Sequence, residues 1–350
     1  MSKLKIVFAV LLLLSSTIVV NADTMTVKNT GNLMDYVIPM EIEYIEIIEV
    51  GNGYEIIQIT KGNGIDDFAF YATYNIGGSI RYDIGLMDID TGLLWITHNP
   101  YIAPKTKLLI QNSTTGEKYY YNVFSGTEAN AYPLQFGDGK YEVKLYEHTT
   151  GSSYKKVYSK VFDVKLDNPL DVFLASILEI NWYVEDEAII LTESLLDGLR
   201  KQLYIADKKL TTDRYVIISD YEDYYLTDDQ IISVCYEYVI KNIAYDYEKI
   251  ETLQYNYIPD IDETLKDKTG ICYDYSVLLA SMLRSQGVPA KLIKGYTTNT
   301  DVYHAWNEIY LEDEERWAVV DTTFDAYYKQ NRMTYSFEKE AEEYVGSIYY

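Results

Sequence analysis

The sequence predicts an α+β protein in which an all-β, sandwich-like domain precedes a domain that combines helices with an antiparallel sheet. Between about residues 35 and 165, short strand-like segments alternate with turn residues, whereas beyond Asp167-Asn168-Pro169 apolar residues recur at helical spacing. The length of 350 residues exceeds one ordinary domain and lets each of two domains bury its own core. We therefore predict domains at residues 23–166 and 167–350, after an N-terminal segment at residues 1–22.

The composition is that of a globular and strongly acidic protein. Lys and Arg number 30 against 54 Asp and Glu, which gives a formal net charge of −24. Nucleic acid is excluded as a partner, because phosphate binding needs a basic face. The only cysteines are Cys235 and Cys272, which excludes a disulfide-dense scaffold and a four-thiolate zinc site. No metal-binding motif stands out, so we predict neither a metal nor another cofactor.

Residues 1–22 have the three parts of a secretory signal peptide. Lys3 and Lys5 make a basic start, residues 6–14 are apolar, and Val20-Asn21-Ala22 places small residues before a cleavage site. The alternative is an uncleaved membrane anchor, but this apolar stretch is interrupted by Ser-Ser-Thr and short for a span of about 20 residues. We expect cleavage after the alanine, export, and no membrane association afterwards. The loss of two lysines changes the net charge to 28 − 54 = −26.

The strand-rich half is expected to form a β-sandwich without chemistry of its own, as a spacer or substrate-presenting module. Its clearest strand is residues 140–147, where apolar and polar residues alternate; a turn at 137–139 precedes it, and residues 154–166 supply its partner. Residues 88–92 resemble part of a calcium loop, but the later acidic ligands are absent and a simple turn is expected. Further strands are predicted at residues 54–60, 67–74, 79–86, 106–111 and 117–124.

Two amphipathic helices, at residues 185–199 and 227–243, are predicted at the start of the second domain. In the second helix, Thr227 and Gln230 form a capping-box pair, and Cys235 falls on the buried stripe. We interpret Cys235 as a small core thiol. The alternative is a disulfide with Cys272.

Cys272 begins the next predicted helix, and the reactive chemistry is expected there. Leu278, Leu279 and Met282 make this a mostly buried helix, and Gly287 is a natural stop after it. The first turn of a helix presents free backbone N–H groups and the positive end of the dipole, both of which stabilise a thiolate. A buried structural thiol is the alternative for a cysteine considered alone.

His304 and Asp321 follow Cys272 at separations of 32 and 17 residues. Strands are predicted at residues 290–297, 303–311 and 317–320. This arrangement lets a nucleophile on a helix face two antiparallel strands, with an imidazole as base and a carboxylate that orients it. The other two histidines, His98 and His148, lie beside turns and are predicted to be solvated.

Four segments around these residues resemble the transglutaminase-like superfamily. They are residues 270–275 (GICYDY), 283–290 (LRSQGVPA), 304–308 (HAWNE) and 321–324 (DTTF). The superfamily includes transglutaminases, peptide N-glycanases and many secreted bacterial proteins. The resemblance covers about residues 185–328, with a core at about 228–328, while the N-terminal half resembles no family that we can name.

The resemblance implies a papain-like core in which a helix packs on an antiparallel sheet. It implies Cys272 as nucleophile, His304 as general base and Asp321 as the residue that orients the base. Trp306, Asn307 and Tyr273 are candidates for substrate binding, although Trp306 beside a strand histidine is as well explained by packing. An oxyanion hole would use the backbone N–H of the nucleophile and a second donor, for which Tyr245 and Tyr247 are weak candidates.

The predicted function is that of an exported cysteine-dependent acyl-transfer enzyme acting on amide bonds of protein or peptide substrates through a thioester. Water as acceptor would make it a peptidase or amidase, and an amine would make it a transglutaminase; the fold does not choose between them. A cell-wall peptide is one candidate substrate. An anionic protein is repelled by anionic wall polymers, which favours a released protein or a specific docking surface. The alternative is a secreted surface or adhesion protein that uses the domain as a binding scaffold. The oligomeric state is left open.

Overall fold

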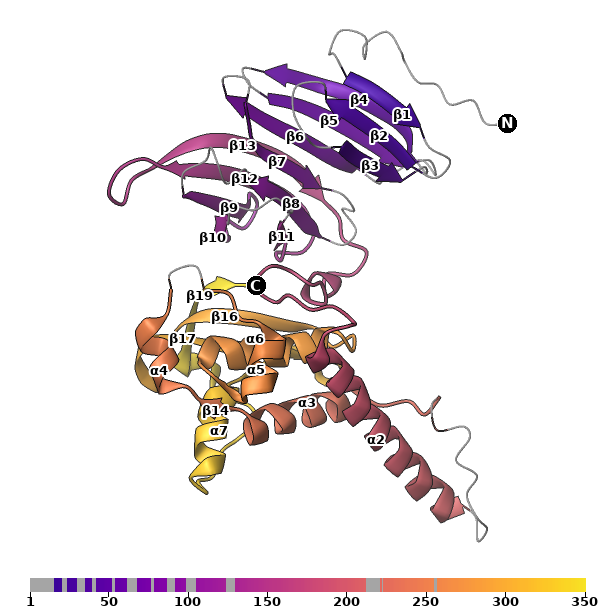
Figure 1. The fold of residues 1–350 in the computed structure, drawn as a ribbon, viewed down its shortest axis with the longest axis vertical. Coiled ribbons are helices and arrows are strands. Elements are labelled where there is room, and N and C mark those ends of the chain that lie inside the picture. Colours follow the sequence, from indigo (N-terminus) through magenta and orange to yellow (C-terminus); the bar gives the residue numbers. More distant parts are fainter. Residues whose placement is uncertain are drawn as a thin grey trace. The chain divides into compact units, whose positions relative to one another are not determined.

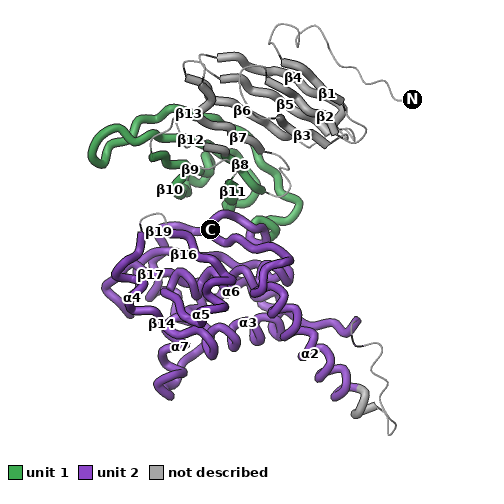
Figure 2. Tube along the Cα trace, in the orientation of Figure 1, with its two compact units in different colours: residues 1–172 green, residues 173–350 purple. Residues whose placement is uncertain are grey.

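The computed structural model describes residues 16–20, 24–29, 35–39, 42–51, 54–61, 68–76, 79–86, 92–98, 105–123, 130–211, 221, 223–254 and 257–350. The chain divides into two compact units, Met1–Val172 and Phe173–Tyr350, which Figure 2 colours separately. Most of the predicted signal peptide, its cleavage site and residues 88–91 of the predicted turn lie outside the described residues.

The described elements of residues 16–164 are strands, and all their pairings are antiparallel. A three-stranded sheet has the order β1-β2-β3, a six-stranded sheet β11-β8-β7-β6-β5-β4 and a four-stranded sheet β10-β9-β12-β13. The strands are β1 (Ser16–Val20), β2 (Thr24–Asn29), β3 (Asp35–Pro39), β4 (Ile42–Gly51), β5 (Tyr54–Lys61), β6 (Phe68–Ile76), β7 (Ser79–Leu86), β8 (Leu93–His98), β9 (Thr106–Asn112), β10 (Lys118–Val123), β11 (Asn130–Pro133), β12 (Gly139–His148) and β13 (Tyr154–Val164).

The alternation predicted for residues 140–147 is present in β12. Tyr141, Val143 and Leu145 are all fully buried, while the residues between them are partly exposed. Tyr141 also donates its hydroxyl proton within the turn that precedes the strand, where the carbonyl oxygens of Leu134 and Gly137 accept at 2.9 and 2.8 Å. One face of this strand therefore belongs to the core of its unit, as its period of two requires.

The second unit combines helices with a four-stranded antiparallel sheet of order β18-β17-β16-β19, which confirms the α+β class (Figure 1). A separate two-residue parallel pair, β14 with β15, lies just before the central helix. The elements are η2 (Asp171–Phe173, across the boundary), α2 (Glu187–Thr211), α3 (Asp228–Asn242), β14 (Ala244–Tyr245), α4 (Tyr247–Thr252), α5 (Ile261–Asp267), β15 (Thr269–Gly270), α6 (Cys272–Arg284), β16 (Ala290–Thr297), β17 (Thr300–Leu311), η3 (Glu312–Glu314), β18 (Arg316–Val320), α7 (Thr322–Gln330), η4 (Ala341–Glu343) and β19 (Tyr344–Tyr349).

Helix α6 is the central element of the second unit and packs against β16 and β17 (Figure 1). All thirteen of its residues are buried, so it is enclosed on every side. Its one buried guanidinium, Arg284, donates to the carbonyl oxygens of Ala175, Ala290 and Tyr350 at 2.7, 2.8 and 3.0 Å. These bonds satisfy a buried charge and tie three distant parts of the chain to the end of the helix.

Several local predictions for the second unit are confirmed. Thr227 is the N-cap of α3 and forms the predicted capping box with Gln230. Gly287 adopts a φ of +82° directly after α6, in the left-handed region that favours glycine. By contrast, α2 extends to Thr211, twelve residues beyond the predicted end at residue 199, and the helix α7 and strand β19 were not predicted. Among the described residues, no helix is both long enough and apolar enough to cross a membrane.

Candidate active site

The nucleophile candidate Cys272 is the first residue of α6, as its sequence context predicts. The preceding residue, Ile271, is extended and serves as the N-cap. The N–H groups of the first turn have no partner inside the helix, and the helix dipole adds positive potential at the same place. The thiol is only 8% exposed. A negative charge on this sulfur is therefore favoured by the backbone that surrounds it.

Asp274, which has no exposed surface, fixes the geometry of this helix start. Its Oδ2 accepts the backbone N–H of Ile271 at 2.7 Å and lies 3.1 Å from the ammonium of Lys249, and its Oδ1 accepts a short hydrogen bond from the hydroxyl of Tyr257. A Cβ on Gly270 would lie 2.6 Å from the Cβ of Asp274, so only glycine fits at this position. Asp274 thus fixes the backbone of Gly270 and Ile271, directly before Cys272.

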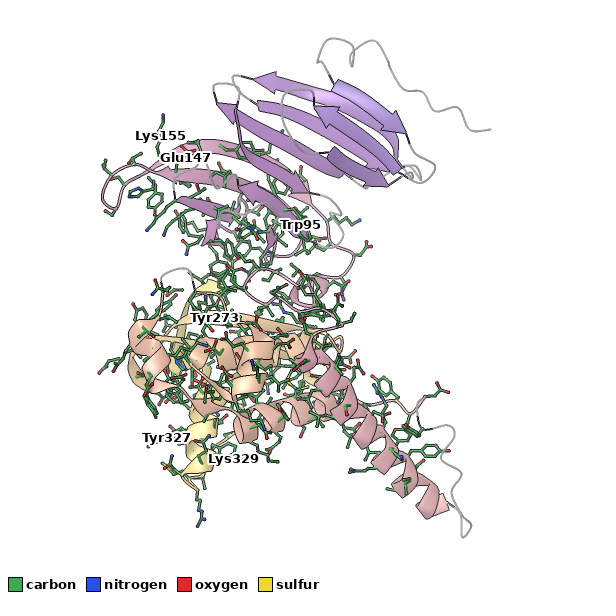
Figure 3. The ribbon with its side chains drawn as sticks, in the orientation of Figure 1. Trp95, Glu147, Lys155, Tyr273, Tyr327 and Lys329 are labelled. Carbon is green, nitrogen blue, oxygen red and sulfur yellow. The ribbon has the colours of Figure 1, made fainter. Side chains whose placement is uncertain are left out.

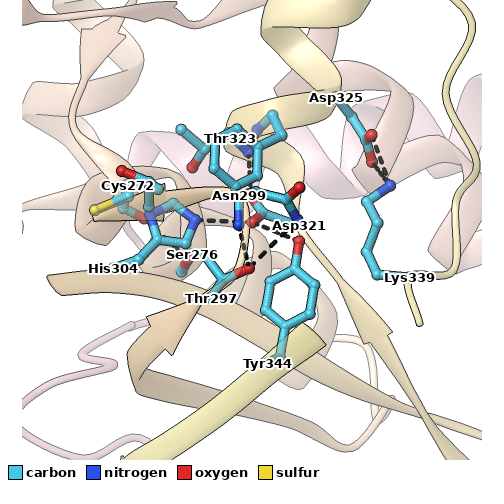
Figure 4. Close-up of polar contacts among 12 residues, drawn as sticks. Cys272, Ser276, Thr297, Asn299, His304, Asp321, Thr323, Asp325, Lys339 and Tyr344 are labelled. Carbon is cyan, nitrogen blue, oxygen red and sulfur yellow. Dashed lines mark hydrogen bonds and ion pairs between the residues drawn. The ribbon is translucent and has the colours of Figure 1, made fainter. Parts of the chain in front are cut away.

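His304 on β17 and Asp321 at the end of β18 are brought together with Cys272 (Figure 4). The Nε2 atom of His304 lies 2.8 Å from Oδ2 of Asp321. A carboxylate only accepts hydrogen bonds, so Nε2 carries the proton and Nδ1 is the nitrogen left for the thiol. His304 also interacts with the side chain of Cys272, which Figure 4 draws beside the imidazole. His304 and Asp321 are therefore hydrogen-bonded, and Cys272 lies beside the imidazole.

The environment favours the charged form of His304. Burial lowers the pKa of the imidazole, but the negative charge of Asp321, its hydrogen bond and the contact with Cys272 together outweigh burial and raise the pKa to about 10. Asp321 is itself fully buried and is the N-cap of α7, where Oδ1 accepts the backbone N–H groups of Thr323 and Phe324 at 3.1 and 3.2 Å. Its carboxylate thus holds the histidine with one oxygen and the helix with the other.

Aromatic side chains enclose the imidazole. Phe324 stacks on His304 with ring centroids 4.9 Å apart, and Trp306 stacks at 6.3 Å. Tyr344 of β19 donates its hydroxyl proton to Oδ2 of Asp321 at 3.1 Å, which gives that oxygen a second donor. These contacts fix the ring plane and keep the ion pair away from water, which strengthens it.

Among the candidates for substrate binding, Trp306 and Asn307 are buried in the packing of the domain. Trp306 is 2% exposed and belongs to a core cluster with Ile293, Val319 and Tyr344, which agrees with the packing interpretation. Asn307 is fully buried and donates from Nδ2 to the carbonyl oxygens of Ser276 and Lys291, both at 3.0 Å. Asn307 therefore ties α6 to the sheet.

The tyrosine candidates differ in position. Tyr273 is 8% exposed and its ring lies under the ammonium of Lys294, 3.4 Å from the ring centroid. Burial raises the pKa of Tyr245 to about 12, and the negative charge of Cys272 contributes to this increase, so the hydroxyl lies within electrostatic reach of the sulfur. Tyr247 is 68% exposed. Of the two oxyanion-hole candidates, Tyr245 is the more buried.

The remaining cysteine and histidines lie apart from this site. Cys235 and Cys272 are both free thiols in the structure, and burial raises the pKa of Cys235 to about 12. His148 is half-buried and its Nε2 lies 2.7 Å from the carbonyl oxygen of Gly151, so it is less solvated than predicted. The side chain of His98 lies outside the described residues. Within the described part of the chain, no group of three or more His, Cys, Asp or Glu residues is arranged to hold a metal ion.

Sequence reasoning missed four groups that act on the site: Phe324, Tyr344, Lys294 and the Lys249–Tyr257 pair around Asp274. Tyr344 comes 23 residues after Asp321 and reaches it only because β19 pairs with β16. Phe324 lies in the first turn of α7, a helix that was not predicted. No spacing rule relates these residues to the triad, since tertiary packing alone makes them neighbours.

Residues 223–322 match the family model described as the transglutaminase-like superfamily. The match includes Cys272, His304 and Asp321 and ends one residue after Asp321. This segment is a transglutaminase-like domain. The domain therefore coincides with the part of the chain in which the three polar residues meet.

Solved structures with likeness to the chain include transglutaminases and a proposed cysteine protease. A structure described as a TGase is 17% identical, with 39% of this chain and 33% of that chain covered and a TM-score of 0.24. A proposed cysteine protease from Cytophaga hutchinsonii is 12% identical, with 63% and 72% covered and a TM-score of 0.30. Red sea bream transglutaminase is 11% identical, with 66% and 48% covered and a TM-score of 0.27. The match thus spans one third of the first structure and about half of the third. Among curated proteins, no relative was found.

Proposed function

We propose that the protein is a cysteine-dependent acyl-transfer enzyme that acts on amide bonds of proteins or peptides through a thioester. The observation that carries this proposal is the meeting of Cys272, His304 and Asp321, which lie on a helix start and two neighbouring strands. The Nε2–Oδ2 distance of 2.8 Å and the free Nδ1 give His304 the orientation that a general base needs. The transglutaminase-like domain is the expected setting for this chemistry.

The resting site is an ion pair in which the proton of the Cys272 thiol has already passed to Nδ1 of His304, and in the first half of the reaction the thiolate attacks the carbonyl carbon of the amide. The backbone N–H of Cys272 and the hydroxyl of Tyr245 stabilise the oxygen, which becomes negative in the tetrahedral intermediate. The imidazolium then gives its proton to the nitrogen of the leaving group. The C–N bond breaks, ammonia or an amine departs, and the acyl group stays on sulfur as a thioester.

In the second half, His304 takes a proton from water or from a second amine, which attacks the thioester carbonyl. Sulfur leaves as the thiolate and the triad returns to its starting state. Water gives a carboxylic acid and a hydrolase, while an amine gives a new amide and a transglutaminase. Both outcomes use the same residues, so the acceptor that enters the site decides between them.

The experiment compares the wild type with Cys272→Ala and with the matched variant Cys235→Ala. Each protein is incubated with casein and a fluorescent primary amine, and both amine incorporation and new peptide termini are measured. We expect one of the two products from the wild type and from Cys235→Ala, and neither from Cys272→Ala. If all three proteins gave neither product, the non-enzymatic scaffold would be favoured and this proposal rejected.

Thiol reactivity tests the site without knowledge of the substrate. Iodoacetamide should modify Cys272 in the folded wild type faster than a small free thiol, whereas Cys235, which is fully buried, should react only after denaturation. Peptide mass spectrometry distinguishes the two cysteines. Equal reactivity of Cys272 and a free thiol, unchanged in His304→Ala, would contradict the proposed triad.

We also propose that the protein is exported, with residues 23–166 as a β-rich domain and residues 167–350 as the catalytic domain. The charge, apolar stretch and small residues of positions 1–22 support export. N-terminal sequencing of protein recovered from the culture medium of an expressing bacterium tests it, with Asp23 as the expected first residue. Retention of the whole protein in the cytosol, with Met1 intact, would contradict export. A cell-wall peptide is a candidate substrate, to be assayed beside casein.

A further inference from the structure

Two oppositely charged side chains, Lys294 and the buried Glu179, act on Tyr273, the residue that follows the proposed nucleophile. Lys294 stands on β16, where it pairs with Ala305, the residue after His304. Its half-buried ammonium lies 3.4 Å from the centroid of the Tyr273 ring and 5.1 Å from that of Tyr350. Figure 3 labels Tyr273, which belongs to the first turn of α6. The cation is therefore held on an aromatic face directly after Cys272 in the chain.

Glu179 is an acidic side chain for which ordinary packing gives no explanation. It is only 2% exposed, and neither of its carboxylate oxygens has a hydrogen-bond partner among the residues that the structure describes. It lies in a tight two-residue turn closed by the backbone bonds between Ile177 and Ile180, at 3.1 and 3.0 Å. Burying a carboxylate without a hydrogen-bond partner costs free energy, so a nearby positive charge is expected to stabilise it.

That charge is the ammonium of Lys294. Burial raises the pKa of Glu179 to about 7, and the attraction of Lys294 opposes this increase. Burial lowers the pKa of Lys294 to about 8, while the negative charges of Glu179 and Cys272 oppose that decrease. No ion pair within 4.0 Å joins the two side chains in the described residues. The ammonium thus lies over two aromatic rings and interacts electrostatically with the buried Glu179 and with Cys272.

We propose that Lys294 is an electrostatic positioning residue of the Cys272 site, which places a positive charge beside the sulfur, and that Glu179 moderates this charge. The inference deepens the proposed function, on which it rests. Two consequences follow. The ammonium stabilises the thiolate of Cys272, and it attracts acyl donors that carry a carboxylate close to the scissile amide over neutral donors of the same size.

The contrast with Lys291 on the same strand sharpens this assignment. Lys291 also lies over an aromatic ring, 3.7 Å from the centroid of Trp317, but its ammonium is paired with Glu308 at 2.9 Å. Its charge is therefore neutralised locally, and among the groups that perturb its pKa Cys272 does not appear. Lys291→Met is the matched control for Lys294→Met, because it removes the same cation–aromatic contact without changing the charge beside the sulfur.

The test compares alkylation of Cys272 by iodoacetate, which is anionic, and iodoacetamide, which is neutral. Only the thiolate attacks either reagent, so the fraction of Cys272 present as thiolate affects both rates equally and cancels in their ratio. The ratio therefore reports the electrostatic potential at the sulfur. Mass spectrometry of the Cys272 peptide gives each rate in the full-length protein at pH 7, where Lys294, with a pKa of about 8, is mostly charged. The proteins are the wild type, Lys294→Met, Lys294→Arg, Glu179→Gln and Lys291→Met.

We expect Lys294→Met to lower the iodoacetate-to-iodoacetamide ratio by about threefold to thirtyfold, the range for one unit charge about 8 Å away, between bulk water and a partly buried site. Lys294→Arg should keep the ratio, Glu179→Gln should raise it, and Lys291→Met should leave it unchanged. If Lys294→Met does not fold, a ratio that rises in Glu179→Gln and stays unchanged in Lys294→Arg still decides the question. A ratio that is the same in Glu179→Gln, Lys294→Met and the wild type would overturn the inference.

Failure of this inference is distinguishable from failure of the proposed function. A wild-type Cys272 that alkylates fast, with a ratio insensitive to Lys294, would leave the triad intact and make Lys294 a packing residue. A wild-type Cys272 that reacts no faster than a free thiol would instead reject the triad itself. A ratio that falls equally in Lys291→Met and Lys294→Met would show a general charge effect and would also overturn the inference.

Discussion

The substitution Asp321→Asn offers the sharpest test of the proposed triad, because the structure fixes how the new side chain must lie. Oδ1 of Asp321 caps α7 by accepting from Thr323 and Phe324, and asparagine is an equally good cap through its own Oδ1. The amide NH₂ then takes the place of Oδ2, facing Nε2 of His304 and the hydroxyl of Tyr344. The fold is retained, while one hydrogen bond to the imidazole is reversed and the negative charge disappears.

The expected magnitude comes from the pKa of His304, which is about 10 in the wild type. Removing an opposite charge at hydrogen-bond distance lowers such a pKa by about 1 to 3 units. This corresponds to about 1.4 to 4 kcal/mol less stabilisation of the imidazolium. The amide also donates to Nε2, so Nδ1 carries the proton and cannot accept the one from the thiol. A fall in the rate of the chemical step on the order of 10³ to 10⁴ is expected.

NMR of the imidazole C–H groups measures the pKa directly, because the chain has three histidines in all. The resonance that disappears in His304→Gln identifies His304. Its midpoint should lie near 10 in the wild type and lower in Asp321→Asn. Tyr344→Phe is the matched control, because it removes a donor to the same oxygen but keeps the charge. A midpoint that does not move in Asp321→Asn would refute the reasoning.

Three further predictions concern the stability of the domain. Asp274→Ala leaves Lys249 without its buried partner and should lower the free energy of unfolding by about 3 to 5 kcal/mol, measured by urea titration. A loss below that of an ordinary surface mutation would show that Asp274 does not hold the start of α6 in place. Gly270→Ala places a Cβ against Asp274 and should cost about 1 to 3 kcal/mol in the same assay, unless the helix start can shift. For Asp325, burial raises the pKa from 3.8 to about 6 although the ammonium of Lys339, at 2.6 and 2.7 Å, opposes this. The folded state thus binds the proton of Asp325 more tightly than the unfolded state does. The contribution of this proton to the free energy of unfolding is therefore fully present below pH 3.8 and is lost as the pH rises through about 6. Lys339→Met removes the charge that opposes this increase, so it should lower the free energy of unfolding more at pH 8 than at pH 5. An equal loss at the two pH values would contradict this prediction.

Much of the local structure was predictable because it depends on neighbours in the sequence. The capping box of Thr227 and Gln230 needs only two residues three positions apart, and the strand β12 needs only its alternation. The bounds of β16 were also predicted, since a glycine stop precedes it and a turn follows. The length of α2 was underestimated, because the helix continues past the residues with clear apolar spacing.

The candidate triad was predictable from chemistry and from family resemblance, and in the structure His304 and Asp321 are hydrogen-bonded. Asn307, a candidate for substrate binding, lies in the interior, where its amide binds two backbone carbonyl groups. Alternation along a strand assigns a residue to a face, but it does not say whether that face meets solvent or another element. Only the packing of α6 on the sheet answers that question.

The sequence by itself determined the charge, the candidate signal peptide, the helix that begins at Cys272 and the order of nucleophile, base and carboxylate. Each of these is a property of composition or of spacing along the chain. Tertiary structure alone decided that Tyr344 bonds to Asp321, and that Lys294 lies over the ring of Tyr273, next to Cys272 in the chain, and interacts with the buried Glu179. These residues come from segments far apart in sequence, and their charges interact only because burial removes the water that would otherwise screen them.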